Sequence, residues 1–163
     1  MHSNIDISAL VQYLITHNIS ISSAESCSGG RISKLITDIP GCSSIYPGGV
    51  CAYSNEMKIK WLNVNSSTLE QHGAVSAETA LEMAQGIREV TGSDYGISTT
   101  GIAGPGGGSA EKPVGLVYIA VVGPNYQKVE KLPLNQNIPL TRDTIQQQTA
   151  EYALYMLINS LKL

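Results

Sequence analysis

Charged side chains are scarce in this chain of 163 residues: they make up 14% of it, where about a quarter is usual for a soluble protein. The formal net charge is only −3, and no run of Lys or Arg occurs, so the composition argues against a nucleic-acid partner. No apolar run is long enough to span a bilayer, which argues against a membrane protein. Segment 1–6 contains no basic stretch followed by an apolar one, so we expect a cytoplasmic protein.

Cysteine and histidine are also scarce, with three residues of each. Cys27, Cys42 and Cys51 are odd in number and include no Cys-x-x-Cys pair, so neither a disulfide framework nor a thiolate zinc site is indicated. No two histidines have the spacing of metal ligands either. We therefore expect a reducing compartment and no metal.

The length suits one domain over residues 1–163 with a substantial core. Apolar spacing predicts helices over 7–17, 32–39, 56–62, 77–91 and from about 141 onward, and strands over 19–22, 45–53, 94–99, 114–122 and 126–132. The last two strands can form a hairpin, with 126–132 at the sheet edge because it carries several charges. The alternation predicts an α/β fold, a single three-layer α/β/α domain with a mixed, mostly parallel sheet.

The polar stretch 23–30, Ser-Ala-Glu-Ser-Cys-Ser-Gly-Gly, lies between a strand-like run and a helix-like run. In an open α/β sheet, ligands collect where the carboxyl end of a strand meets the next helix, because backbone N–H groups there are unpaired. Ser26 is therefore a candidate nucleophile, and Gly29 and Gly30 would let a ligand approach the backbone. The alternative is an ordinary strand-to-helix turn in which Ser28 caps the helix.

A serine nucleophile needs a base, and Lys58 is the strongest candidate. On a helical wheel of segment 56–62, Lys58 falls inside the apolar arc formed by Met57, Ile59, Trp61 and Leu62. Desolvation in that position lowers the pKa of the amine toward working pH. The alternatives are that Lys58 reaches the surface or pairs with an acid such as Glu25.

Other candidate proton carriers are less well placed. Tyr53, at the end of strand 45–53, could relay or hold the proton, and the alternative is a buried ring with a satisfied hydroxyl. His2 is terminal, His17 ends a surface helix, and His72 lies in a Gln-His-Gly turn. A serine–histidine pair is therefore not favoured.

A second glycine-rich stretch, 100–109, follows the strand 94–99. It lacks the Gly-Lys-Ser/Thr of a phosphate-binding P-loop and does not open a helix as dinucleotide-binding glycines do, but its amides could line a pocket. Arg142 lies in the first turn of the last helix, where a cation is not electrostatically favoured, which suggests an anion within reach. An ordinary surface arginine is the alternative.

Four segments together resemble the C-terminal domain family of CinA, in order and over nearly the whole chain. They are 24–30 (AESCSGG), 48–58 (GGVCAYSNEMK), 72–76 (HGAVS) and 100–115 (from TGIAGPGGG to EKPVG). Stand-alone members of that family, of the PncC type, hydrolyse the carboxamide of nicotinamide mononucleotide to nicotinic acid mononucleotide and ammonia. The resemblance implies this activity, with a small nucleotide as substrate and with no cofactor or metal.

When the site residues of the family are transferred to the matching motifs, the resemblance implies Ser26 as nucleophile, Lys58 as base and Tyr53 as their partner. It implies acyl transfer through an acyl-enzyme, with backbone N–H groups of 28–30 or 101–104 stabilising the oxyanion. Substrate contacts are expected from Ser28, Gly29, Gly30, Gly48, Asn55, Thr100, Gly101, Gly104 and Arg142.

Two residues depart from the family pattern: Thr141 stands where Gly or a charged residue is usual, and Gln146 where a second arginine is common. The departure bears on phosphate affinity and leaves the serine–lysine pair untouched. Two other interpretations stay open. One is a non-catalytic nucleotide-binding module in which Ser26 only caps a helix, and the other is a cysteine hydrolase with Cys27 as nucleophile, for which no histidine is well placed. The sequence also leaves open whether the domain forms a homo-oligomer.

Overall fold

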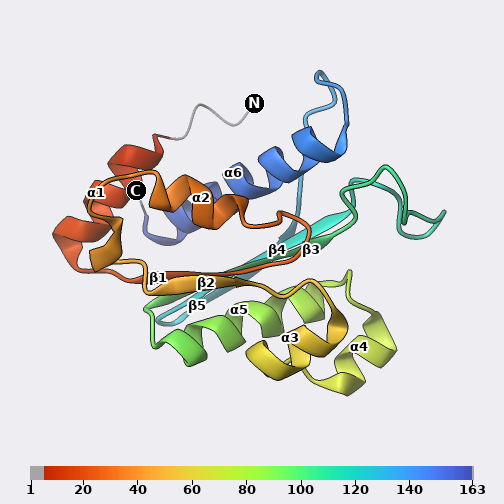
Figure 1. Cartoon of the computed structure of the whole chain (residues 1–163), viewed down its shortest axis with the longest axis horizontal. Coiled ribbons are helices and arrows are strands. Elements are labelled where there is room, and N and C mark those ends of the chain that lie inside the picture. The colour runs from red at the N-terminus through yellow and green to blue at the C-terminus, as the bar shows by residue number, and fades with distance from the viewer. Residues whose placement is uncertain (1–5, 163) are drawn as a thin grey trace.

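The computed structural model describes residues 6–162, whose helices and strands are shown in Figure 1. The helices are α1 (Ile7–His17), α2 (Arg31–Thr37), α3 (Asn55–Leu62), α4 (Ser66–His72), α5 (Ala77–Thr91) and α6 (Arg142–Ser160), with a short 3-10 helix η1 (Cys42–Ser44). The strands are β1 (Ile21–Glu25), β2 (Gly48–Cys51), β3 (Tyr95–Gly101), β4 (Val117–Gly123) and β5 (Tyr126–Lys131).

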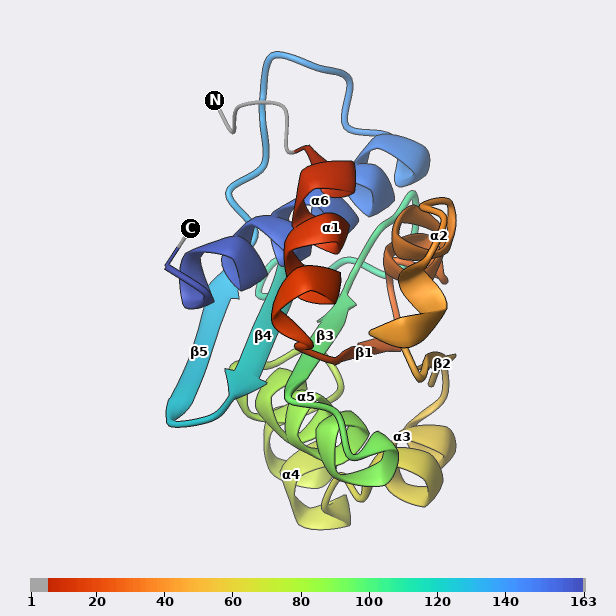
Figure 2. The same ribbon diagram turned by 90° about the vertical axis from the view of Figure 1, so that its left-hand side faces the viewer.

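The five strands form one mixed sheet in the order β2-β1-β3-β4-β5. β1 pairs in parallel with β2 and β3, whereas β4 is antiparallel to β3 and β5 to β4, so four of the five strands point the same way. Helices α1, α2 and α6 lie on one face and α3, α4 and α5 on the other (Figure 1, Figure 2). The expected α/β/α layers and the mixed, mostly parallel sheet are confirmed.

Several helices begin and end where the capping signals in the sequence predict. The Asp6 side chain accepts a hydrogen bond from the N–H of Ala9 at the start of α1, and Asn18 ends that helix in the left-handed region. Ser76 caps α5 in the same way, and Gly92 ends it with a positive φ of 67°. These two helices are therefore bounded by local chemistry.

The two faces of the sheet are packed differently. Large apolar residues such as Ile21, Ile97 and Ile119 fill the core cluster that includes α1, α2 and α6. On the α5 side the sheet carries small residues: a Cβ atom at Gly96 would lie 2.1 Å from the carbonyl oxygen of Ala84. α5 therefore packs directly against the backbone of β3. α3 and α4 lie on the same side of the sheet as α5 (Figure 1).

Some strand boundaries differ from those expected. β1 runs over Ile21–Glu25 and not over 19–22, because this central strand is paired on both sides up to Glu25. Three residues assigned to the turn therefore belong to a completely buried strand. β2 is shorter than the expected 45–53, and β4 begins at Val117 because the chain before it belongs to the glycine-rich loop.

Two predictions about the helices failed: α4 was missed, and the apolar face of α3 was placed wrongly. α4 was not expected, because its residues are mostly polar and only Leu69 is buried. In α3 the wheel placed Ile59 and Trp61 with Lys58, yet both are exposed, and the buried residues of the helix are Lys58 and Leu62. The buried stripe of α3 is thus one helical turn long and narrow. None of the helices within residues 6–162 is long and apolar enough to cross a membrane.

Candidate active site

Ser26 directly follows β1, at the point where the connections of the sheet diverge. The chain leaves β1 through α2 toward β2 on one side, and then returns through α3, α4 and α5 to β3 on the other side. Such a switch point opens a crevice at the carboxyl ends of the strands. The Ser26 N–H donates to the Thr99 carbonyl oxygen at 3.0 Å, which ties the serine to the end of β3.

The turn that carries Ser26 is anchored by Glu25, whose carboxylate is completely buried. It accepts hydrogen bonds from the hydroxyls of Ser28 and Ser33 and from the backbone N–H groups of Gly30, Ile32 and Ser33. The carboxylate therefore satisfies the N-terminus of α2, where a negative charge is favoured by the helix dipole.

This arrangement rules out two of the alternatives. Ser28 is not the N-cap of α2: that position is Gly30, which makes no side-chain capping bond. Glu25 is likewise no partner of Lys58, because its oxygens are bonded to the turn and to α2.

Lys58 meets Ser26 from the opposite layer. Its side chain is 1% exposed, and Nζ lies 3.1 Å from Ser26 Oγ. Nζ also donates to the carbonyl oxygens of Ala52 at 2.8 Å and Tyr53 at 3.4 Å. In a neutral amine the two hydrogens can go to these carbonyls, which leaves the nitrogen lone pair directed at the serine hydroxyl.

Burial shifts the pKa values of the Lys58 amine and the Cys27 thiol in opposite directions, and in both cases it favours the neutral form. It lowers the pKa of Lys58 from the ordinary lysine value, because the charged form loses its hydration and no carboxylate in residues 6–162 pairs with it. Burial also raises the pKa of the Cys27 thiol to about 12, so that side chain stays protonated. The site thus favours a neutral amine next to a serine and disfavours a thiolate.

A cavity of about 260 Å³ opens at Ser26 and Lys58. Besides Cys27, it is lined by Tyr53, by the apolar Ala74 and Val75, by segment 100–104, by the glycines 106 and 107, and by Arg142. Of the predicted site residues, the structure thus brings together Ser26, Tyr53, Lys58, Thr100, Gly101, Gly104 and Arg142.

Arg142, in the first turn of α6, links this helix to Tyr53 and to the glycine-rich segment that contains Gly104. Its guanidinium donates to the Gly104 carbonyl oxygen and to the Tyr53 hydroxyl, both at 2.7 Å. Tyr53 is 61% exposed, so the buried-ring alternative is wrong. Its hydroxyl lies with Arg142 at the mouth of the cavity, whereas its backbone carbonyl contacts Lys58.

The other predicted substrate contacts lie outside the cavity lining. Ser28 is completely buried, and the N–H groups of Gly29 and Gly30 are already bonded to the Ser26 carbonyl and to Glu25. Gly48 pairs with Ser22, at the opposite end of β2 from the site. Asn55 is exposed in the first turn of α3.

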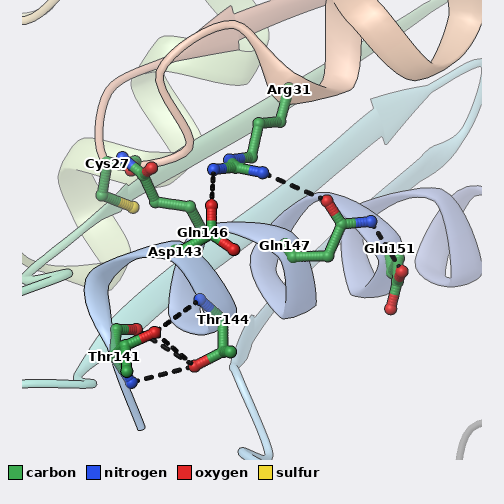
Figure 3. A network of polar contacts seen from close by, with 8 residues as sticks. All are labelled: Cys27, Arg31, Thr141, Asp143, Thr144, Gln146, Gln147 and Glu151. Atoms are coloured by element: carbon green, nitrogen blue, oxygen red, sulfur yellow. Dashed lines mark hydrogen bonds and ion pairs between the residues drawn. The ribbon is translucent and has the colours of Figure 1, made fainter.

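The Gln146 side chain extends from α6 toward the turn that carries Ser26 (Figure 3). Its Nε2 donates to the Cys27 carbonyl oxygen at 2.9 Å. Beside it, Arg31 at the start of α2 bonds to Asp143 and Gln147 of α6. The residue that stands in place of an arginine therefore helps to fix the turn that carries Ser26.

Thr141, the second departure from the family pattern, caps α6. Its hydroxyl accepts from the N–H of Thr144, and the Thr144 hydroxyl accepts from the Thr141 N–H, which forms a capping box (Figure 3). This cap fixes the first turn of α6, from which Arg142 extends into the cavity.

The remaining candidates are not gathered here. His72 ends α4, and its Nδ1 lies 3.7 Å from a Glu78 carboxylate oxygen, away from the cavity lining. Within residues 6–162, no three His, Cys, Asp or Glu side chains are grouped as a metal site would require. Sequence reasoning did not find the anchoring role of Glu25, for which a carboxylate directly before the serine was the one available signal.

The family model of the CinA C-terminal domain matches residues 6–161. The chain belongs to this family. A putative competence-damage inducible protein of Caldanaerobacter subterraneus is 49% identical to this chain over 147 residues, which are 90% of this chain and 35% of that protein. A CinA-like protein of Leptospira interrogans is 46% identical over 154 residues, 94% of this chain and 36% of that protein. The chain spans about a third of the length of these curated relatives.

Solved structures give the same result. The competence/damage inducible protein CihA from Agrobacterium tumefaciens has a TM-score of 0.86 at 39% identity, covering 95% of each chain. The competence damage-inducible protein A from Klebsiella pneumoniae has a TM-score of 0.88 at 29% identity, covering 96% of each chain. The CinA domain thus shares its whole fold with both, and its reaction has to be argued from the site.

Proposed function

We propose that this CinA domain hydrolyses the carboxamide of nicotinamide mononucleotide to nicotinic acid mononucleotide and ammonia by a serine–lysine mechanism. The observation that carries the proposal is the 3.1 Å contact between the buried Lys58 amine and the Ser26 hydroxyl at the floor of a cavity. A base within hydrogen-bond reach of the hydroxyl is what a serine nucleophile requires.

In the first half-reaction, Ser26 Oγ attacks the carboxamide carbon while the neutral amine of Lys58 accepts the hydroxyl proton. The proton then passes to the departing nitrogen, so ammonia leaves and an ester joins Ser26 to the nicotinoyl group. In the second half-reaction, Lys58 deprotonates a water molecule that cleaves the ester. Lys58 returns that proton to Ser26 Oγ as the ester bond breaks, so the hydroxyl and the neutral amine are restored and nicotinic acid mononucleotide leaves.

The oxyanion of each tetrahedral intermediate needs backbone donors. The N–H groups of Gly29 and Gly30 are already used, which makes them unsuitable. Cys27, Ala103 and Gly104 line the cavity, and among the described residues their N–H groups donate to no acceptor. We assign the oxyanion to these donors, whose partial charges are fixed in place before the reaction.

Arg142 is the candidate partner of the substrate phosphate. A guanidinium has five N–H donors, and two of them are used by Gly104 and Tyr53. The others can bind phosphate oxygens without release of the existing contacts, and the Tyr53 hydroxyl beside them is exposed to the same ligand.

The test is ammonia release from nicotinamide mononucleotide by the wild type and by three variants. Ser26→Ala and Lys58→Met are expected to lose activity by about a thousandfold or more, since they remove groups that act as one unit. Cys27→Ala is the matched control, with a rate within about threefold of wild type, because its thiol takes no part. Wild-type rates in Ser26→Ala would overturn the proposal. Binding of the nucleotide without ammonia release would identify a nucleotide-binding module instead.

A further inference from the structure

The turn 72–75 between α4 and α5 is held by side chains at each of its four carbonyl groups. Lys112 supplies two of these bonds, from Nζ to the first and the last carbonyl oxygen of the turn, at 2.8 and 2.9 Å. The two middle carbonyls accept from the hydroxyls of Thr79, Ser76 and Thr100. The turn is thus fixed from several sides, although only its first residue, His72, belongs to a helix and residues 73–75 have no regular secondary structure.

Lys112 differs from the other donors in where it comes from. Thr79 belongs to α5, Thr100 belongs to β3, and Ser76 caps α5, so these three donors are parts of rigid elements. Lys112 belongs to the glycine-rich loop 102–116, which projects beyond the sheet near the connection between α4 and α5 (Figure 1). It is therefore the donor that joins two irregular segments to each other.

Both segments form walls of the cavity. The turn contributes Ala74 and Val75, and the loop contributes its residues 102–104, 106 and 107. At its base the loop is closed by backbone bonds between Ile102 and the pair Gly115 and Leu116. At its tip the described bonds, apart from the two made by Lys112 Nζ, join Ser109 to Lys112 and are internal to the loop.

The charge of Lys112 suits this role. Its ammonium group reaches the C-terminal end of α4, where the unpaired carbonyls carry partial negative charge. Hydrogen bonds from a charged donor are stronger than neutral ones, and no acidic side chain in residues 6–162 forms an ion pair with Lys112. Its interactions are therefore directed at the turn.

We propose that Lys112 is a positioning residue that ties the glycine-rich loop 102–116 to the turn 72–75 and thereby holds both walls of the cavity for the substrate. This inference rests on the proposed amidase function. Among the described contacts, the Lys112 side chain bonds to neither Ser26 nor Lys58. Its loss should consequently weaken substrate binding more than it slows the chemical step. The proposed oxyanion donors Ala103 and Gly104 lie at the base of the loop, which stays closed by the Ile102 backbone bonds and by the bond from Arg142 to Gly104.

The kinetic test compares Lys112→Met with Lys112→Arg, which keeps a charged donor of similar reach. In ammonia-release assays, KM of Lys112→Met for nicotinamide mononucleotide is expected to rise about tenfold with kcat within about threefold of wild type. Lys112→Arg is expected to restore most of the KM. Lys34→Met on the exposed face of α2 is the matched control and should leave both constants unchanged. An unchanged KM in Lys112→Met, or a fall in kcat alone, would overturn the inference.

A second measurement does not depend on activity. In hydrogen exchange, backbone amides of the turn and the loop should exchange about tenfold faster in Lys112→Met than in wild type, while those of β1 and β3 keep their protection. Lys112→Arg should again resemble the wild type. If the wild type releases no ammonia, the proposed function fails by itself, and the exchange result still decides whether Lys112 ties the loop to the turn. Equal exchange in wild type and Lys112→Met would rule that tie out.

Discussion

Lys58 is the largest side chain that is completely buried in the described part of the chain. An amine in that position is costly for a fold, because an ion loses its hydration and a neutral amine must find hydrogen-bond acceptors. Here two carbonyl groups and one hydroxyl meet this need. At the scale of single residues, the site is therefore defined by a buried amine whose pKa is lowered by the loss of water.

This protonation predicts the pH dependence of the proposed amidase reaction. The neutral amine is the active form, so kcat/KM should rise with pH, by up to tenfold per unit, until it levels off at an apparent pKa below the ordinary 10.5 of lysine. The measurement is the pH profile of ammonia release. Cys27→Ala should give the same profile, since the Cys27 thiol stays protonated with a pKa of about 12. Activity that falls with rising pH across the same range would contradict a lysine base.

The residues of the site differ in how far the sequence could predict them. The placement of Lys58 followed from helical periodicity, and its burial is confirmed. Glu25 could not be found in this way, because its role depends on a strand end facing the first turn of a helix up to eight residues later. Gly48 and Asn55 were expected to contact the substrate, but local sequence does not show which end of a strand or which face of a helix borders a cavity.

At the scale of elements, α5 positions α3, and α3 carries Lys58. A Cβ atom at Gly86 of α5 would lie 1.8 Å from the carbonyl oxygen of Leu62, the last residue of α3. The absence of a side chain at Gly86 therefore allows the two helices to approach each other. α4 also packs on α5, but it does so through one buried residue, Leu69. Its sequence therefore has too little apolar periodicity to predict a helix.

The close approach predicts the effect of Gly86→Ala. Alanine normally stabilises a helix interior relative to glycine by about 1 kcal/mol, but here the added methyl group meets backbone that cannot move independently. We expect the free energy of unfolding in urea to fall by about 3 kcal/mol. Glu89→Ala, at an exposed position of the same helix, should change it by less than about 0.5 kcal/mol. A Gly86→Ala variant as stable as the wild type would show that α3 and α5 can separate freely.

At the scale of the whole molecule, both helical layers contribute to one site. Ser26 is fixed by α2 and α6 on one face of the sheet, through Glu25 and Gln146, and Lys58 arrives from the other face. The order of the layers was predictable from the alternation of helices and strands. Which helix ends face each other across the sheet was not, because this depends on strand order and register.

This construction predicts that the layers unfold together. Trp61, the single tryptophan, lies on α3 and reports on the layer that carries Lys58. Its fluorescence and the far-UV circular dichroism of all helices should therefore change with urea at the same midpoint, within about 0.2 M, as for a two-state domain. A tryptophan transition well below the circular dichroism transition would show instead that α3 opens on its own.

The hairpin between β4 and β5 lies at the other end of the sheet from the cavity. Gly123, the last residue of β4, follows Val122, which pairs with Gly96 near the start of β3. The cavity is lined by Gly101, at the end of β3. The tip of the hairpin at Pro124 and Asn125 is exposed. A peptide tag or an immobilisation linker inserted at this tip would consequently lie away from the cavity, so the hairpin is a natural attachment point for engineering the domain.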